Sequence, residues 1–232
     1  MESEVVNEME NGRAATAPSE RVALGRHTER GQYDFETIAA ILDEALVCHV
    51  GFVADGQPYV IPTTYARIGH DLYIHGSPVA RWIRVLGSRA PLCVTVTLLD
   101  GLVLARSAFR HSMNYRSVVV LGCVTQVDDP QEKMRAFEAL IEHVAPGRWN
   151  DSIRHPSDAE IRATMVLRIP LDEASAKMRI GPPLDADGDL ARDVWAGHLP
   201  MSLVAGEPAA DPVLVRSFEI PRYVAEYSRA AK

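Results

Sequence analysis

A cluster of hydrogen-bonding side chains lies between apolar segments in the middle of the 232-residue chain. The apolar segments, 95–99, 102–105 and 118–121, predict strands that bury their side chains. Polar side chains between such strands are typical of a site on a rigid sheet, and planar cations and amides suit an anionic, planar ligand. A polar loop that only joins two strands is the alternative interpretation. The cluster consists of Arg106, Ser107, Arg110, His111, Ser112, Asn114, Tyr115, Arg116 and Ser117.

A second candidate site is the motif S-P-x-x-R, in which Ser77 and Arg81 follow a short strand predicted at 72–75. Pro78 is well placed in the first turn of a helix expected from Val79 to Leu86, with Ser77 at the N-cap position. A helix N-terminus with a hydroxyl group and a guanidinium group suits a phosphate. An ordinary helix start is the alternative.

The histidines offer two candidates for chemistry. His75 ends the strand before this turn and could contact a ligand or substrate, and His111 is the second candidate. Ser112 beside His111 is not expected to be a nucleophile, because no carboxylate near it in sequence could orient the histidine. His49 is expected to be a structural residue of a strand. The spacings H-x-H and H-E-x-x-H are absent, so no metal site is predicted.

Composition limits the classes of partner. The net charge of −7 argues against nucleic-acid binding, and no apolar run reaches the roughly 18 residues of a membrane span. The N-terminus is acidic and lacks an apolar signal region, so the chain is expected to be cytoplasmic. Cys48, Cys93 and Cys123 form no C-x-x-C pair and lie in apolar runs, which predicts buried, reduced thiols.

Cap and turn residues predict how the first third of the chain is divided. Asp34 is placed to cap a helix that ends near Ala45. Strands are expected over 47–54 and 57–67, joined by a turn at Asp55-Gly56.

Two prolines indicate where this sheet is interrupted. Pro58 and Pro62 remove backbone donors from the strand over 57–67, which is therefore expected to be irregular or at a sheet edge. Asp100-Gly101 predicts a further hairpin turn. Other strands are expected at 91–99, 102–107, 116–127, 165–170 and 176–180, and helices at 130–144, from 157 and within 221–232.

Six to eight strands and only three or four helices predict a mainly β fold. Tight turns favour antiparallel pairing, and so few helices favour a small closed barrel with flanking helices over an open sheet. We expect a disordered tail over 1–20, a barrel domain over 21–180 and a C-terminal extension over 181–232. The extension is expected to pack on the barrel or on a partner subunit.

Four motifs in a fixed order carry a family resemblance. They are Y-V-I-P-T-T-Y (59–65), Y-I-H-G-S-P-V-A-R (73–81), T-V-T-L-L-D-G-L-V-L-A-R-S (95–107) and H-S-M-N-Y-R-S-V-V-V-L-G (111–122). Between Tyr33 and Pro200 the chain resembles the pyridoxamine 5'-phosphate oxidase-like FMN-binding split-barrel family, most closely its nitroimidazole-resistance-related branch. The resemblance implies a six-stranded antiparallel split β-barrel with peripheral helices. It also implies a homodimer that binds FMN in clefts at the subunit interface.

The resemblance assigns the contacts to FMN. The strand that ends at Tyr65 would meet the edge of the flavin ring, and the turn from His75 to Arg81 would bind the phosphate. Asn114 and Arg116 would reach the cofactor from the partner subunit, and Trp195 would form an apolar wall. The cofactor-binding residues are thus expected to be Val60, Ile61, Pro62, Thr63, Thr64, Tyr65, His75, Gly76, Ser77, Arg81, Asn114, Arg116 and Trp195.

The same resemblance implies the catalytic residues, and two departures from it limit phosphate binding and the choice of substrate. His75 best matches a functional histidine of the nitroimidazole-resistance branch, and His111 is the second match, so these two are the expected catalytic residues. Trp82 stands where a second basic residue is common in the oxidase, so Arg84 or Arg106 would have to assist in phosphate binding. The C-terminus lacks the oxidase's arginine-x-histidine element, so pyridoxamine phosphate is not the expected substrate.

These observations predict an FMN-dependent oxidoreductase that acts on a small organic substrate, with reduction of a nitro compound as the most specific form. Two alternatives stay open. One is a flavin- or haem-binding module without turnover, in which His75 or His111 would be the axial ligand of haem. The other is a deazaflavin-dependent reductase on the same barrel.

Overall fold

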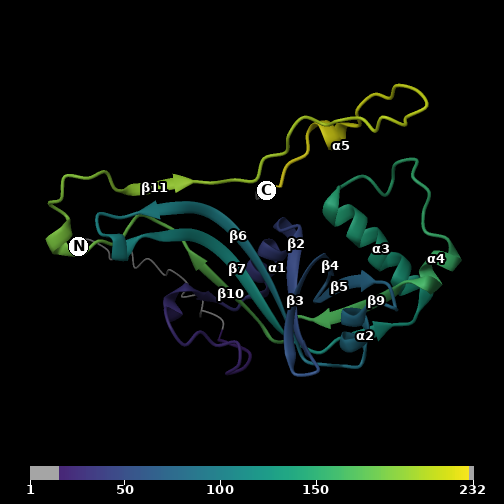
Figure 1. The fold of residues 1–232 in the computed structure, drawn as a ribbon, viewed down its shortest axis with the longest axis horizontal. Helices are drawn as coiled ribbons and strands as arrows, with labels where there is room; N and C mark the ends of the chain where they lie inside the picture. Colours follow the sequence, from purple (N-terminus) through teal and green to yellow (C-terminus); the bar gives the residue numbers. More distant parts are fainter. Residues whose placement is uncertain (1–15, 230–232) are drawn as a thin grey trace, which may run out of the picture.

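The structure is a computed structural model, and it describes residues 16–229. Two antiparallel sheets form its centre, and the larger one runs along the long axis of the molecule (Figure 1). The strands of the larger sheet lie in the order β1, β10, β7, β6, β2, β3, and β11 pairs with one half of β6. Their bounds are Gly31–Gln32 (β1), Val47–Ala54 (β2), Gln57–Thr64 (β3), Leu92–Leu104 (β6), Ser112–Gly122 (β7), Ala174–Arg179 (β10) and Gly197–Pro200 (β11).

The smaller sheet lies at one end of the larger one, and its strands follow the order β4, β5, β9, β8 (Figure 1). These strands are Ala66–Ile68 (β4), Asp71–Gly76 (β5), Thr125–Val127 (β8) and Met165–Pro170 (β9). The α-helices are peripheral, and they are Phe35–Glu44 (α1), Arg81–Gly87 (α2), Pro130–Val144 (α3), Asp158–Ala163 (α4) and Arg222–Ala225 (α5). The predicted fold class, a mainly β antiparallel split barrel with peripheral helices, is confirmed. The predicted tail over 1–20 falls largely outside the described residues.

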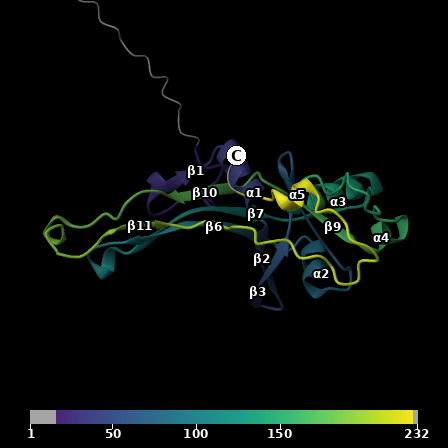
Figure 2. The same ribbon diagram turned by 90° about the horizontal axis from the view of Figure 1, so that it is seen from above.

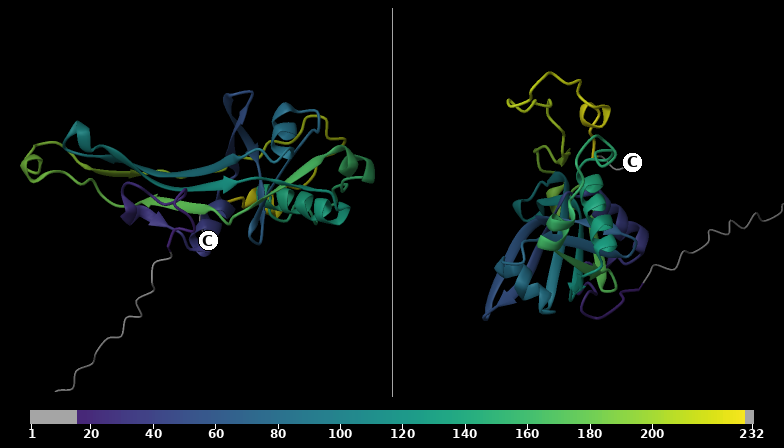
Figure 3. Two further views of the ribbon diagram at one scale, coloured as in Figure 1. Left: turned by 90° about the horizontal axis from the view of Figure 1, so that it is seen from below. Right: turned by 90° about the vertical axis from the view of Figure 1, so that its right-hand side faces the viewer.

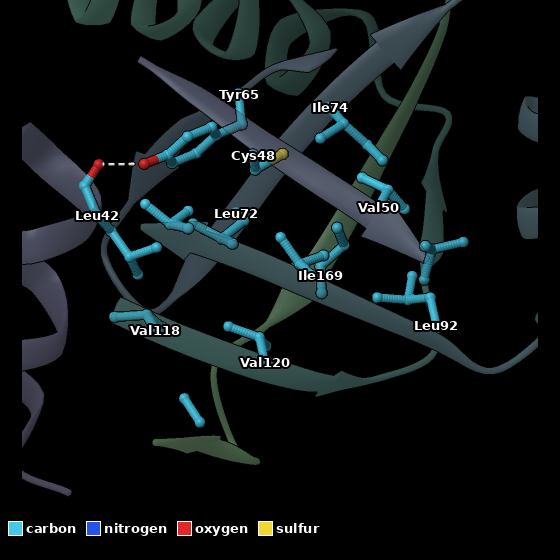
Figure 4. Packing of buried hydrophobic residues seen from close by; sticks show 14 of the residues in the cluster. Leu42, Cys48, Val50, Tyr65, Leu72, Ile74, Leu92, Val118, Val120 and Ile169 are labelled. Carbon is cyan, nitrogen blue, oxygen red and sulfur yellow. Dashed lines mark hydrogen bonds between the residues drawn. The ribbon is translucent and has the colours of Figure 1, made fainter. Parts of the chain in front are cut away.

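Both sheets and the first two helices contribute to one aliphatic core (Figure 4). Alternate residues of β2, including Val50, point into it, as alternation along a strand with one buried face requires. The other strands supply valine, leucine and isoleucine side chains that are almost completely buried. They include Leu72, Ile74, Val94, Val96, Val118, Val120, Leu167 and Ile169.

Local signals in the sequence account for several elements as predicted. The Asp34 carboxylate accepts a hydrogen bond from the amide of Thr37 at 2.8 Å and so begins α1. Asp55 and Gly56 both have positive φ and form the turn between β2 and β3. Ser157 and its helix α4 form a complete capping box.

The expected strand over 57–67 is broken at Tyr65, and this is a correction. At this residue the chain leaves β3 of the larger sheet and enters β4 of the smaller one. The Tyr65 side chain is fully buried, and its hydroxyl donates to the carbonyl oxygen of Leu42 at the end of α1 (Figure 4). A second carbonyl oxygen, that of Ala45, lies 3.2 Å from the same hydroxyl. Tyr65 therefore holds the corner between the two sheets.

Asp100-Gly101 does not form the predicted hairpin turn. The strand β6 continues through it, with an irregular register against β7 between Leu99 and Gly101. The reason is a distant partner, because β11 passes so close that a Cβ atom on Gly101 would lie 2.7 Å from the carbonyl oxygen of Leu199. The glycine permits this close approach. The turn that joins β6 to β7 instead contains the 3₁₀ helix Ala108–Arg110.

The C-terminal extension contacts the rest of the chain at several places, including Asp185 with Arg106. β11 lies along β6, and α5 lies near α3 (Figure 2). Between them, residues 201–220 are exposed, and Figure 3 shows part of this segment standing away from the sheets. Beyond α5, the Arg229 guanidinium donates to the carbonyl oxygens of Glu44 at 3.0 Å and His143 at 2.7 Å.

The three cysteines are only partly as predicted. Cys48 is buried and Cys93 is half-buried, but Cys123 is exposed because it lies in the short link between β7 and β8. Burial raises the pKa of the Cys48 thiol to about 12. Within residues 16–229, no helix has the length and apolar character needed to cross a membrane.

Replacing Tyr65 by phenylalanine should lower the free energy of unfolding by about 1–3 kcal/mol, because buried carbonyl groups at the end of α1 lose their donor. Urea unfolding measures the change. Tyr115→Phe is the matched control, since the Tyr115 hydroxyl has no hydrogen-bond partner among the described residues. Equal stabilities of the two variants would contradict the role assigned to the corner.

Candidate functional site

The strongest candidate site lies where the edge strand β3 meets the start of α2. The Arg81 guanidinium lies over the ring of Tyr59, 4.5 Å from its centroid. Within residues 16–229 it has no carboxylate partner, unlike Arg106 and Arg116, which are paired with acidic side chains. A cation–π contact leaves its N–H groups free, so Arg81 can still bind an anion.

The turn before α2 differs from the sequence prediction. The helix begins at Arg81 rather than at Val79, and Ala80, not Ser77, occupies the N-cap position without a side-chain hydrogen bond. The carbonyl oxygen of Ser77 accepts the amide of Ala80 at 2.9 Å, which closes a tight turn. The Ser77 hydroxyl is therefore not used as a cap and is exposed one helical turn from Arg81.

Gly76 explains how this turn packs on the barrel. A Cβ atom at Gly76 would lie 2.8 Å from the Ile83 side chain and 3.2 Å from Trp82. The glycine thus allows α2 to lie directly against the end of β5. Gly76 is the last residue of β5, Ser77 lies in the connection that follows, and Arg81 is the first residue of α2.

The predicted flavin strand lies at a sheet edge, because β3 pairs with β2 alone. Its residues alternate between two faces. Val60, Pro62 and Thr64 are exposed on the outer face, whereas Ile61 packs against the core. Thr63 is half-buried on the inner face with Ile61, and the buried Tyr65 has its hydroxyl engaged at the corner, so Tyr65 is not available to a ligand.

His75 lies on β5 behind this turn. Its ring makes an edge contact with Phe137 of α3, with 5.9 Å between the ring centroids. Its Nδ1 atom is buried and has no hydrogen-bond partner among the described residues. Burial lowers the pKa of His75, so the ring is neutral near pH 7.

The remaining predicted residues lie on the other half of the larger sheet. His111 lies at the tip between β6 and β7, the opposite end of the molecule from α2 (Figure 1), and its Nδ1 is 3.0 Å from the carbonyl oxygen of Ser107. Asn114 is buried and bonded to Arg179 and to the carbonyl oxygen of Gly181. Trp195 is 67% exposed and precedes β11. The structure therefore does not bring His111 and His75 together.

Arg116 is already engaged within the chain. Its guanidinium donates to Glu44 at 2.8 Å and to Asp100 at 2.9 Å. Hydrogen bonds from the guanidinium to Glu44 and then Asp100 raise the pKa of Arg116 further above its usual value. The sequence did not predict either carboxylate as a partner of Arg116. Glu44 lies on a different element, 72 residues away. Arg106 is likewise paired, with Asp185 at 3.0 Å, and so does not assist Arg81.

A groove of about 670 Å³ lies beside the Arg116 cluster, where β2 begins and β6 continues past it. Its lining includes His49 of β2 and Met201 of the C-terminal extension. No group of three or more histidine, cysteine or acidic side chains placed to hold a metal ion occurs in the described part of the chain. Alternation along β2 could have placed the His49 side chain on the outer face, because its neighbours Cys48 and Val50 point inward.

A family model described as pyridoxamine 5'-phosphate oxidase matches residues 34–178, which is more than half of the chain. The chain belongs to this family. Membership accounts for the edge strand, the β5–α2 turn and the two sheets together. No curated protein sequence matches the chain.

Solved structures of the pyridoxamine 5'-phosphate oxidase type extend the likeness. The flavocytochrome Anf3 from Azotobacter vinelandii is 38% identical, with a TM-score of 0.85, and the match covers 90% of this chain and 97% of that one. The FAD and heme binding protein from Mycobacterium smegmatis is 34% identical, with a TM-score of 0.80, covering 84% and 95%. A protein named for 5-nitroimidazole antibiotic resistance, from Bacteroides thetaiotaomicron, is 27% identical, with a TM-score of 0.53, covering 63% and 85%.

His75 gives this family member a pH-dependent stability. Because its pKa is lowered in the folded state, the unfolded chain binds a proton first as the pH falls below about 6.5. The free energy of unfolding should therefore fall between pH 7.5 and 5.5. In His75→Leu the free energy of unfolding should fall less steeply with pH. Some pH dependence should remain, because burial also lowers the pKa of His143.

Urea unfolding at the two pH values measures this difference. His198→Leu is the control, since His198 is exposed on β11. If His75→Leu and the control lose equal stability on acidification, the buried ring does not carry the effect.

Proposed function

We propose that this chain is a redox protein that binds a flavin at the junction of β3 and α2 and also carries haem. The observation on which this rests is the unpaired Arg81 guanidinium, with the exposed Ser77 hydroxyl beside it and an edge strand next to both. The proposal refines the expected FMN-dependent oxidoreductase and combines it with the haem-binding alternative.

The donors at this junction fit a flavin phosphate. A phosphate dianion takes charge-assisted hydrogen bonds from a guanidinium and a hydroxyl, and Ser77 in the turn and Arg81 at the start of α2 supply these two groups. The flavin ring needs donors and acceptors along one edge and apolar contact on its faces. The outer face of β3, with exposed Val60, Pro62 and Thr64, offers apolar side chains and edge-strand backbone groups.

The relatives favour FAD and haem over the narrower sequence hypotheses. The proteins named as a flavocytochrome and as an FAD and haem binder are 38% and 34% identical and cover most of the chain. The protein named for nitroimidazole resistance covers less of it at lower identity, so nitro-compound reduction has weaker support. The flavocytochrome match must also extend into the segment 201–232, because the unmatched tenth of the chain is shorter than this segment.

The chain's own residues bind and orient these groups. Arg81 and Ser77 fix the phosphate, β3 positions the ring edge, and Gly76 keeps α2 close enough for all three to act together. When bound, a flavin supplies one- and two-electron redox chemistry, and haem supplies one-electron chemistry. His75 contributes a neutral ring behind the phosphate turn, where it supports the position of β5 against α3.

We also propose that the protein is a homodimer through the outer face of the larger sheet. Val53 is 56% exposed and Val60 is 64% exposed on this face, and the register, which pairs Val53 with Pro58 and Val60 with Gly51, makes them diagonal neighbours. Val47 and Leu99 extend the same apolar surface. Apolar patches of this kind mark protein–protein interfaces.

Arg81→Ala should weaken flavin binding about 10- to 100-fold, because a charge-assisted hydrogen bond is worth about 1.5–3 kcal/mol. Titration with FAD and with FMN, followed by visible absorption, measures the loss. Arg135→Ala on α3 removes an equally exposed charge elsewhere and should bind as the wild type does. An Arg81→Ala protein with unchanged affinity for both flavins would overturn the phosphate assignment.

Val53→Asp should convert the dimer to a monomer, because it places a charge within the apolar outer face. Light scattering after gel filtration should give about twice the chain mass of 25.5 kDa for the wild type and half that value for the variant. Ile180→Asp, at an exposed apolar position outside this face, is the control. A monomeric wild type would contradict the proposal.

A further inference from the structure

We propose that the groove at the start of β2, beside β6, is a haem site, with His49 as the axial ligand of the iron. The proposal rests on the haem component of the proposed function and names the site and the ligand, which that function leaves open. It replaces His75 and His111, the two ligands that the sequence suggests, with a histidine that the sequence marks as structural.

The groove has the size and the walls that this ligand needs. Its volume of about 670 Å³ lies within the range of roughly 300–1,000 Å³ that is usual for small-molecule and cofactor sites. Apolar side chains from three parts of the chain line it. They are Leu46, Val47, Leu98, Leu99, Met201 and Leu203.

His49 is the histidine whose ring is both free and inside a groove. It lies on the outer face of β2 and makes no hydrogen bond, ion pair or ring contact with another residue between 16 and 229. Most other histidines are occupied: His143 donates to the carbonyl oxygen of Ala45 at 2.7 Å, and His155 stacks on Trp149 at 4.2 Å. His198 is also free, but it does not line the groove.

The two histidines favoured by sequence fit the iron less well. The Nδ1 atom of His75 is buried among protein atoms. His111 is exposed at the tip between β6 and β7, and its Nδ1 faces the carbonyl oxygen of Ser107. A haem ligand needs a free ring nitrogen beside a large apolar space, which the structure provides at His49.

The charged side chains of the groove already have partners within the chain. Arg116 is balanced by Glu44 and Asp100, and both carboxylates line the groove with it. The Arg229 guanidinium is used by backbone carbonyl groups at the ends of α1 and α3. With both guanidinium groups engaged, phosphate or another small anion finds no unpaired cation here.

The C-terminal extension supplies one wall of this groove. The amide of Met201 donates to the carbonyl oxygen of Asp100 at 3.0 Å and so fixes the wall beside β6. The family model ends at residue 178 and does not include this segment, whereas the flavocytochrome match extends into it.

The groove also adjoins the proposed flavin strand. His49 is the direct cross-strand partner of Pro62 on β3, and both side chains are exposed on the same face of the sheet. Adjacent strands lie about 4.8 Å apart. The two proposed sites are therefore neighbours on one surface.

Haemin titration of the full-length chain tests the site, with the Soret band as readout and an FAD titration in parallel. Removing a group that only orients a metal ligand costs about 10- to 100-fold in affinity, so His49→Ala should weaken haemin binding at least about tenfold. His198→Ala should bind as the wild type does. Imidazole added to His49→Gly should restore the Soret position of the wild type, and unchanged FAD binding shows that the variants are folded.

The outcomes separate the two proposals. If the wild type and His49→Ala bind haemin equally, the site is wrong while the proposed function stands, and loss of binding in His75→Ala would then identify the ligand. If the wild type takes up FAD but no haemin, the haem site and the haem component both fail. If it takes up neither, the proposed function itself fails.

Discussion

The whole arrangement depends on the last carbonyl groups of α1, which have no partner within the helix. The Tyr65 hydroxyl donates to those of Leu42 and Ala45, and His143 of α3 donates to Ala45 as well. The Arg229 guanidinium donates to the carbonyl oxygens of Asp43 and Glu44. The end of α1 thus connects the corner between the sheets, α3 and the C-terminal extension. Leaving these carbonyl groups buried without a donor would cost free energy.

This junction decides which face of the larger sheet is covered. The smaller sheet turns back at Tyr65 and, with α1, fills the inner face with aliphatic side chains. The outer face keeps exposed valines and leucines in the single chain. The proposed subunit contact lies on that outer face, as do His49 and Pro62, whereas Arg81 of the proposed flavin site stacks on Tyr59 at the inner face of β3.

Sequence signals that act within a few residues were sufficient for many elements. The Asp34 cap and the Asp55-Gly56 turn each form as predicted, because each depends on neighbouring backbone groups. Features with distant partners were missed. Gly101 permits the close approach of β11, which lies almost a hundred residues further along the chain. Arg116 donates a hydrogen bond to Glu44 of α1.

The candidate site likewise combines features that a local sequence pattern predicts with features that depend on distant partners. The turn with Gly76, Ser77 and Arg81 was found from its motif, but the start of α2 and the place of Tyr65 depend on tertiary packing that no local pattern records. His49 needed only strand alternation, yet its significance depends on a groove that a segment 150 residues away completes.

The unequal burial of the three thiols makes the natural chain selectively addressable by alkylating reagents. Thiolates are the reactive form, so Cys48, buried and with its pKa raised to about 12, resists such reagents. Burial also raises the pKa of the half-buried Cys93. Cys123 is exposed in the link by which the chain passes from β7 to β8. A fluorophore attached there would label the junction between the two sheets without any engineered cysteine.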